Sequence, residues 1–215
     1  MATIRLTPST YSLSNTSYLS ISNASNMYHN TDNTTYATIT NSRTGTSSYY
    51  VYIKGFNFND IPSDAIINSF TVKLKAYESG VSTSTSYRPY LCNNTTQLNG
   101  YSNVLSTSTQ TLTFSNVTES WDTIKGYGSN FGIRINCRRA SRNTTSYVYI
   151  YGAEILVDYT MPEPCVVTSI LTGDGTISPN GITNTYKNTE YELTITPTNN
   201  SDPITITNNG TDVTN

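Results

Sequence analysis

Apolar residues recur at every second position along much of this chain. Between residues 66 and 77 one face holds Phe70, Val72, Leu74 and Ala76, and the other holds Thr71, Lys73, Lys75 and Tyr77. This alternation predicts a strand with one face in a core and the other in water. Residues 49–58 are also rich in aromatic and β-branched side chains, and the break at 59–64, which contains Pro62, is too short for a crossover helix. We therefore expect 49–58 and 66–76 to form adjacent antiparallel strands.

Further short segments have the composition or the alternation of strands. They are residues 3–6, 18–21, 36–40, 87–92, 109–114, 131–138, 146–151 and 153–159. In 131–138 the pattern places Phe131, Ile133, Ile135 and Cys137 on the inner face, and Gly152 predicts a bulge or tight bend. About ten short strands with no long amphipathic helix predict an all-β fold, a β-sandwich, and we favour the jelly-roll arrangement.

The only tryptophan, Trp121, lies in a segment that interrupts the strands. Ser120 precedes it as a helix cap would, and Gly126 and Gly128 indicate a return of the chain after one short helical turn. Trp121 is either a plug beneath its loop, the interpretation we favour, or a platform for a sugar ring.

The chain divides at Met161-Pro162-Glu163-Pro164, where two prolines predict a stiff linker over residues 161–164. Residues 1–160 then form the β-sandwich. Residues 165–215, with strands expected at 166–171, 191–197 and 203–207, are at the low end of length for an independent core. We expect a small Ig-like β-sandwich that moves relative to the first domain or is completed by neighbouring chains.

Composition narrows the function classes. Charged residues make up 12% of the chain and the net charge is −2, so the basic field of a typical nucleic-acid-binding domain is missing. The 18 tyrosines, together with many Ser, Thr and Asn residues, indicate a polar but uncharged surface suited to contact with a protein or a sugar. The N-terminal segment lacks the apolar run of a secretory signal, and no stretch is long and apolar enough to span a membrane. The chain is then either assembled in the cytosol or processed to remove a leader, and Met1 favours the first.

The sequence gives little support for a catalytic function. The single histidine, His29, has Asp32 three residues on, but no nucleophile motif accompanies it. No pair of carboxylates stands in a recognisable hydrolase motif. We expect a loop histidine and a protein that is not an enzyme.

Metal and disulfide sites are also weakly indicated, and we expect no cofactor. Structural calcium stays open through Asp32, Asp60 and Asp64, whereas Asp174 between two glycines is typical of a turn. The three cysteines lie at wide spacings outside zinc motifs. Cys137 is expected to be a buried free thiol, and a Cys92–Cys137 bridge stays open.

Two groups of surface residues are candidate binding sites. Tyr147, Tyr149 and Tyr151 share a strand face and, with Trp121, form a candidate glycan platform; ordinary cross-strand packing is the alternative that we favour for the tyrosines. A basic cluster is the candidate protein interface, in which arginines would engage an acidic partner, with a simple solvated face as the alternative. Its members are Arg134, Arg138, Arg139 and Arg142.

Several packing motifs resemble those of known β-sandwich modules. The pattern F-x-F-x-x-I-P-x-x-A-x-I is carried by Phe56, Phe58, Ile61, Pro62, Ala65 and Ile67. The closing pattern Y-G-A-E-I-x-V-x-Y spans residues 151–159. Both resemble a module of phage structural proteins that looks like the DNRLRE and galactose-binding-like jelly rolls of bacterial surface proteins. The tail, with LTGDGTISPNG and YELTITPTNN, resembles bacterial Ig-like or internalin B-repeat modules but stops early.

This resemblance implies a non-enzymatic virion structural protein, assembled in the host cytoplasm and displayed on the particle surface as a capsid decoration or head fibre. Its partners would be other virion proteins, and a symmetric homo-oligomer is expected. The alternative is a tail-fibre or baseplate module that recognises host carbohydrate.

Overall fold

The computed structural model describes residues 1–42, 49–79, 88–137, 145–199 and 203–212. The chain folds into two compact units, Met1–Thr160 and Met161–Asn215. The division falls at the first residue of the Pro-rich segment, and the first strand of the second unit begins at Pro164. None of the helices in the described part of the chain has the length and hydropathy that a membrane span needs.

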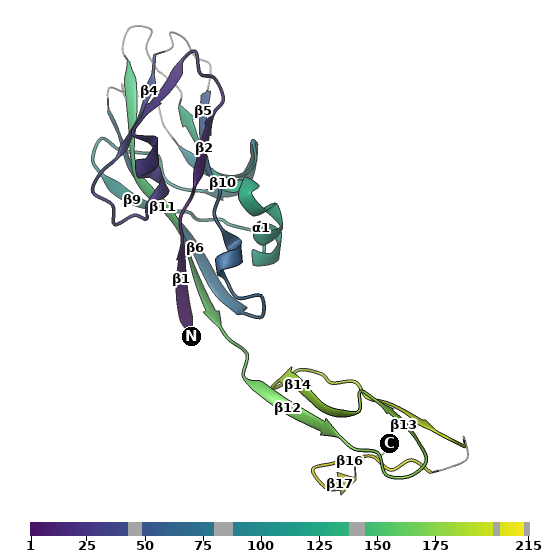
Figure 1. Cartoon of the computed structure of the whole chain (residues 1–215). Helices are drawn as coiled ribbons and strands as arrows, with labels where there is room; N and C mark the ends of the chain where they lie inside the picture. Colours follow the sequence, from purple (N-terminus) through teal and green to yellow (C-terminus); the bar gives the residue numbers. More distant parts are fainter. Residues whose placement is uncertain (43–48, 80–87, 138–144, 200–202, 213–215) are drawn as a thin grey trace. The chain divides into compact units, whose positions relative to one another are not determined.

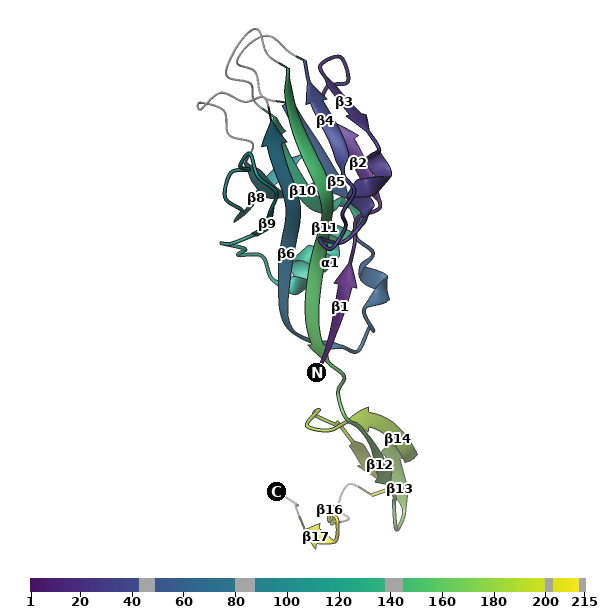
Figure 2. The ribbon, with the colours of Figure 1, turned by 90° about the vertical axis from the view of Figure 1, so that its left-hand side faces the viewer.

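The first unit is a sandwich of two antiparallel sheets (Figure 1). The strand order of sheet A is β3 (Leu19–Ser22), β4 (Ala37–Asn41), β11 (Ser146–Thr160), β6 (Ile66–Ser79) and β9 (Gln110–Thr113), and β1 (Ala2–Leu6) also pairs with β11. Sheet B runs in the order β2 (Thr10–Leu13), β5 (Tyr49–Lys54), β10 (Phe131–Cys137), β7 (Pro89–Asn93) and β8 (Thr96–Tyr101). Figure 2 shows β6 and β11 side by side along this unit.

The connections between the sheets make the fold a jelly roll. From β4 to β11 the chain places four strands in each sheet, in the orders β4-β11-β6-β9 and β5-β10-β7-β8. Each sheet therefore interleaves early and late strands of the segment, as two nested Greek keys do. The predicted all-β sandwich is confirmed.

The predicted pairing of residues 49–58 with 66–76 is wrong. The strand β5 lies in sheet B and β6 lies in sheet A, so the connection crosses from one sheet to the other. It contains the 3-10 turn η2 (Phe58–Asp60), and Phe58 and Ile61 are only 5% and 4% exposed. Because these side chains enter the core between the sheets, the connection is anchored there rather than forming a hairpin at one edge.

Inward-facing apolar side chains form one core. The four predicted inward residues of β10, Phe131, Ile133, Ile135 and Cys137, are fully buried. In β6 the predicted inner face is also confirmed, since Val72, Leu74 and Ala76 are buried and Phe70 packs against the core. Burial of this apolar area is the main stabilising contribution to the sandwich.

Gly152 marks an irregularity in β11, as predicted. The pairing of β11 with β6 shifts register between Ile150 and Gly152. A Cβ at residue 152 would lie 2.3 Å from the carbonyl oxygen of Asn30, and the Ala153 N–H donates to the His29 carbonyl at 3.0 Å. The backbone after η1 (Ala24–Tyr28) approaches β11 so closely that only glycine fits there.

The helix α1 (Trp121–Tyr127) is the short helical turn expected after Ser120. The Ser120 hydroxyl accepts a hydrogen bond from the Thr123 N–H at 3.2 Å, which caps the helix. Ile124 is buried, and η3 (Gly128–Asn130) leads into β10. The cap and the buried face of α1 together orient Trp121.

The second unit consists of three two-stranded antiparallel pairs. These are β12 (Pro164–Ser169) with β14 (Gly181–Tyr186), β13 (Gly175–Ser178) with β15 (Thr194–Pro197), and β16 (Thr207–Asn208) with β17 (Thr211–Asp212). Among its described residues no apolar side chain is buried, and Val166, Ile170 and Ile182 are exposed. The all-β character is confirmed. Of the strand expected at 203–207 only Thr207 lies in a strand, at the start of β16. The Ig-like assignment stays a prediction.

Candidate functional site

A row of side chains crosses the outer face of sheet B. Tyr52 of β5 lies opposite Arg134 of β10, and Arg134 lies opposite Tyr90 of β7. Tyr90 in turn lies opposite Tyr101 of the edge strand β8. Directly opposed residues point to the same side of a sheet, and Ile133, next to Arg134, is completely buried on the other side. We call these four residues, Tyr52, Arg134, Tyr90 and Tyr101, the Tyr–Arg row.

Arg134 is held in a defined position at the centre of this row. Its guanidinium carbon lies 3.8 Å from the ring centroid of Tyr50, a cation–π contact. One terminal nitrogen donates to the carbonyl oxygen of Thr95 at 3.3 Å. Its Nε is buried and has no hydrogen-bond partner among the described residues. The side chain therefore keeps unused donor capacity in a fixed orientation.

The charges of sheet B have one sign. Its five strands contain two charged residues, Lys54 and Arg134, and no carboxylate. The Lys54 ammonium lies 5.7 Å from the ring centroid of Tyr52, and burial raises the pKa of the Tyr52 hydroxyl. In a chain of net charge −2, the outer face of sheet B is thus a local basic surface.

Only one member of the predicted arginine cluster can be placed. Arg134 points outward, as its position between Ile133 and Ile135 predicts. Arg138, Arg139 and Arg142 lie outside the described residues.

Five tyrosines gather on the outer face of sheet A. Tyr147, Tyr149 and Tyr151 come from β11, Tyr77 from β6, and Tyr36 precedes β4. Tyr77 and Tyr149 lie opposite each other and stack at 4.4 Å between ring centroids, with 12° between their planes. Tyr36 meets Tyr149 and Tyr151 edge-on, at 5.1 Å and 5.3 Å. We call these five residues the tyrosine cluster.

The ring geometry of the tyrosine cluster is that of cross-strand packing. The stacked faces of Tyr77 and Tyr149 cover each other, and burial raises the pKa of both hydroxyls. The Lys75 ammonium lies 5.1 Å from the Tyr151 ring centroid and also donates to the Asn33 carbonyl at 2.9 Å. A sugar ring stacks on an open aromatic face, and these contacts occupy such faces. The use of Tyr147, Tyr149 and Tyr151 as a glycan platform stays a prediction.

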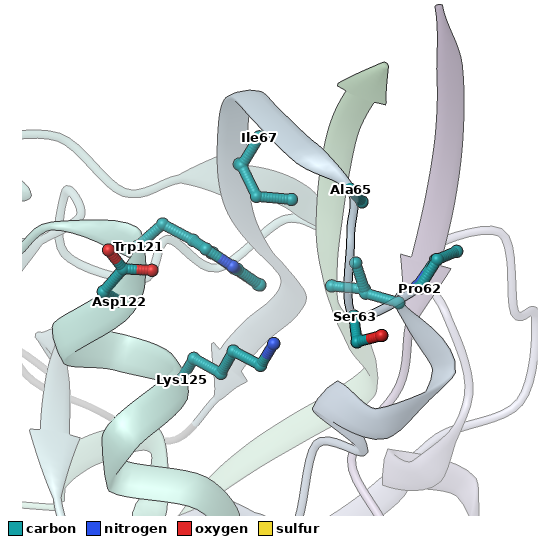
Figure 3. A pocket seen from close by; sticks show the side chains of 8 residues that line it. Pro62, Ser63, Ala65, Ile67, Trp121, Asp122 and Lys125 are labelled. Carbon is teal, nitrogen blue, oxygen red and sulfur yellow. The ribbon is translucent and has the colours of Figure 1, made fainter. Parts of the chain in front are cut away.

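Trp121 lies elsewhere, against the core and beside a pocket. Its ring contacts Phe58 edge-on and Phe70 at an inclined angle, each with 5.5 Å between ring centroids. The pocket has a volume of about 260 Å³ and lies between α1 and the connection from η2 to β6 (Figure 3). Its lining residues are Ile61, Pro62, Ser63, Ala65, Ile67, Trp121, Asp122 and Lys125. Trp121 is therefore only partly a plug, because its ring also forms a wall of this Trp121 pocket.

In the described part of the chain, His29 and Asp32 do not form a catalytic arrangement. His29 is exposed, and its carbonyl holds the β11 bulge. Asp32 instead forms an ion pair with Arg5, which also lies 3.1 Å from the buried carboxylate of Glu154. Glu154 accepts a further hydrogen bond from the Thr31 hydroxyl at 2.7 Å. Asp32 and Glu154 therefore belong to a structural ion-pair network at β1.

The residues considered as metal ligands or disulfide partners have other roles in the described structure. Asp60, the last residue of η2, accepts a hydrogen bond at 2.6 Å from the side chain of Asn57, the N-cap residue of this turn. Among the described residues, no three His, Cys, Asp or Glu side chains come together as metal ligands would. All three cysteines are free, so the Cys92–Cys137 bridge is not formed.

The sequence reasoning identified Arg134 and Trp121 but missed their neighbours. Tyr90 and Tyr101 join the Tyr–Arg row through strand pairing, and Tyr101 belongs to β8, which lies outside the predicted strand segments. The alternation of residues 49–54 already placed Tyr50 and Tyr52 on one face. Their juxtaposition with Arg134 required the β5–β10 register.

No protein-family model matches this chain, and no curated protein matches it. Among solved structures, one described as "CBM4 structure and function" is similar, with a TM-score of 0.31 and 13% sequence identity. The match covers 58% of this chain and 84% of that chain. A likeness of this size has no bearing on ligand or partner.

Proposed function

We propose that this chain is a non-enzymatic structural protein of a bacteriophage particle, and that it docks onto another virion protein through the outer face of sheet B. The part of the Tyr–Arg row from Arg134 to Tyr101 is the observation that supports the docking surface, since these residues are partly or fully exposed whereas Tyr52 is buried. Tyrosine and arginine are among the side chains enriched in interface hot spots, and a positioned arginine can engage a carboxylate through two parallel hydrogen bonds. The absence of carboxylates from the five strands of sheet B favours an acidic partner surface.

The phage assignment is supported by the motif resemblance. The residues that carry it, Phe56, Phe58, Ile61 and Pro62, anchor or adjoin the connection that crosses between the sheets. Purified particles of the phage that encodes the chain should contain it in stoichiometric amounts by mass spectrometry. Its absence from the particles would contradict the assignment.

The docking surface is tested by reversing one charge. The variant Arg134→Glu removes the central cation of the Tyr–Arg row and places a carboxylate opposite an acidic partner. We expect its affinity for particles that lack the chain to fall at least tenfold, about 1.4 kcal/mol, in a cosedimentation assay. Wild-type binding should also weaken as salt is added.

A matched control comes from the other sheet. Lys73→Glu makes the same charge change on the outer face of sheet A, opposite Glu154 and Thr113. Thermal unfolding checks that both variants are folded. Equal binding by Arg134→Glu and Lys73→Glu would reject sheet B as the docking surface.

Carbohydrate recognition by a tail-fibre or baseplate protein is a second candidate function. The observation that favours it is the Trp121 pocket, where the Trp121 ring and the Lys125 amine, unpaired among the described residues, face the same space. The two functions use different surfaces and can be tested separately.

A further inference from the structure

We propose that the Trp121 pocket binds one ring of a neutral saccharide, with Trp121 as the stacking surface and Lys125 and Asp122 as hydrogen-bonding partners of its hydroxyl groups. This inference deepens the second candidate function and is independent of docking through sheet B. It rests on the size of the pocket, the fixation of Trp121, and the presence in the lining of one cation and one carboxylate that are unpaired among the described residues.

The size of the pocket limits its ligand. Pockets for drug-sized molecules have volumes of about 300–1,000 Å³, and the Trp121 pocket, at about 260 Å³, is slightly smaller. It therefore suits a single ring rather than a large cofactor or a folded peptide segment. Ile61, Pro62 and Ala65 form the wall from the connection, and Trp121 faces them from α1.

Trp121 is fixed before any ligand arrives. Phe58 and Phe70 support the ring from the core, and the Ser120 cap holds the start of α1. A rigid aromatic side chain loses little conformational entropy on binding. The apolar C–H face of a pyranose ring is the complement of such a surface.

The polar groups of the lining explain why the ligand is neutral and hydroxylated. Lys125 can only donate hydrogen bonds and the Asp122 carboxylate can only accept them, whereas each sugar hydroxyl does both. Neither side chain has an ion-pair or hydrogen-bond partner among the described residues. Figure 3 shows the Lys125 amine and the Trp121 ring directed into the same space, with Ser63 across from them. Because the lining holds one charge of each sign, it gives no net electrostatic attraction to a ligand that carries a single charge.

The test uses the fact that Trp121 is the only tryptophan of the chain. Its fluorescence, excited selectively over the tyrosines, reports this pocket directly. Titration of the full chain with neutral hexoses, N-acetylhexosamines and their oligosaccharides should give a saturable change in emission, with a dissociation constant of about millimolar order for a single ring. Lys125→Ala and Asp122→Ala, both at exposed positions, should each weaken binding about tenfold or more while the unfolding temperature stays unchanged.

The controls separate this inference from the docking proposal. Arg134→Glu should bind saccharide as the wild type does, and Lys125→Ala should dock onto particles as the wild type does. Three results would overturn the inference: no saccharide in the panel changes the emission, binding survives both pocket substitutions, or only short peptides give a saturable signal. If Arg134→Glu fails to dock onto particles and the wild type binds no saccharide, the docking proposal is supported and the saccharide proposal is rejected.

Discussion

At the scale of single residues, burial sets the reactivity of the three cysteines. Cys92 and Cys137 are fully buried, whereas Cys165 is partly exposed. Burial raises the pKa of the Cys92 thiol to about 12 and also raises the pKa of the Cys137 thiol. Since the thiolate is the reactive form, both should be inert at neutral pH.

We predict that a thiol reagent labels Cys165 in the native protein and labels all three cysteines in denaturant. The rate at Cys92 and Cys137 should be on the order of a hundredfold lower than at Cys165. Peptide mapping by mass spectrometry after a short reaction identifies the labelled residues. Rapid native labelling of Cys92 would contradict its full burial and show that the packing around it is loose.

Single-residue roles were predictable only where they depend on local alternation. The outward direction of Arg134 and the inward direction of Cys137 follow from the same strand pattern. The contact of Arg134 with Tyr50 does not follow from this pattern, because it depends on the register between two strands far apart in sequence. The contacts of Trp121 with Phe58 and Phe70 could not be predicted either, because they join segments that are far apart in sequence.

At the scale of elements, stacked tyrosines join β6 to β11. Tyr77 and Tyr149 are directly opposed and in parallel contact, an arrangement that stabilises neighbouring strands. This role predicts an effect on folding rather than on binding.

We expect Tyr77→Ala and Tyr149→Ala each to lower the free energy of unfolding by about 1–2 kcal/mol. The double variant should lose less than the sum, with a coupling of about 0.5–1.5 kcal/mol from the ring contact. Denaturant unfolding of the four proteins in the cycle measures this coupling. Additive losses, or a loss of partner binding at unchanged stability, would identify the tyrosine cluster as a binding surface instead.

Strands with an apolar inner face were predictable, and polar edge strands were not. The strands β6 and β10 carry their signal in buried residues such as Leu74 and Ile133. The strand β8 has the sequence TQLNGY, and only its residue Gly100 is buried, so its pattern is that of a loop. The incorrect pairing of β5 with β6 has another cause, since a short connection is equally compatible with a hairpin and with a crossing between sheets.

At the scale of the whole molecule, the two units differ in how they bury apolar surface. The first unit has a continuous core between its sheets. In the second, the described apolar side chains stay partly or largely exposed. The length and Pro-rich boundary of the tail indicated such a difference, whereas the pairing of its strands could not be derived from its Gly- and Asn-rich turns.

The central claim is that the outer face of sheet B contacts a partner on the particle while the outer face of sheet A does not. Tyrosine footprinting with hydroxyl radicals tests it directly, because the two faces hold a matched pair: Tyr101 of the Tyr–Arg row is 38% exposed, and Tyr36 of the tyrosine cluster is 37% exposed. When the free chain is compared with the chain on its particle, we expect severalfold protection of Tyr101 and unchanged oxidation of Tyr36. Protection of Tyr36 with Tyr101 still accessible would contradict it.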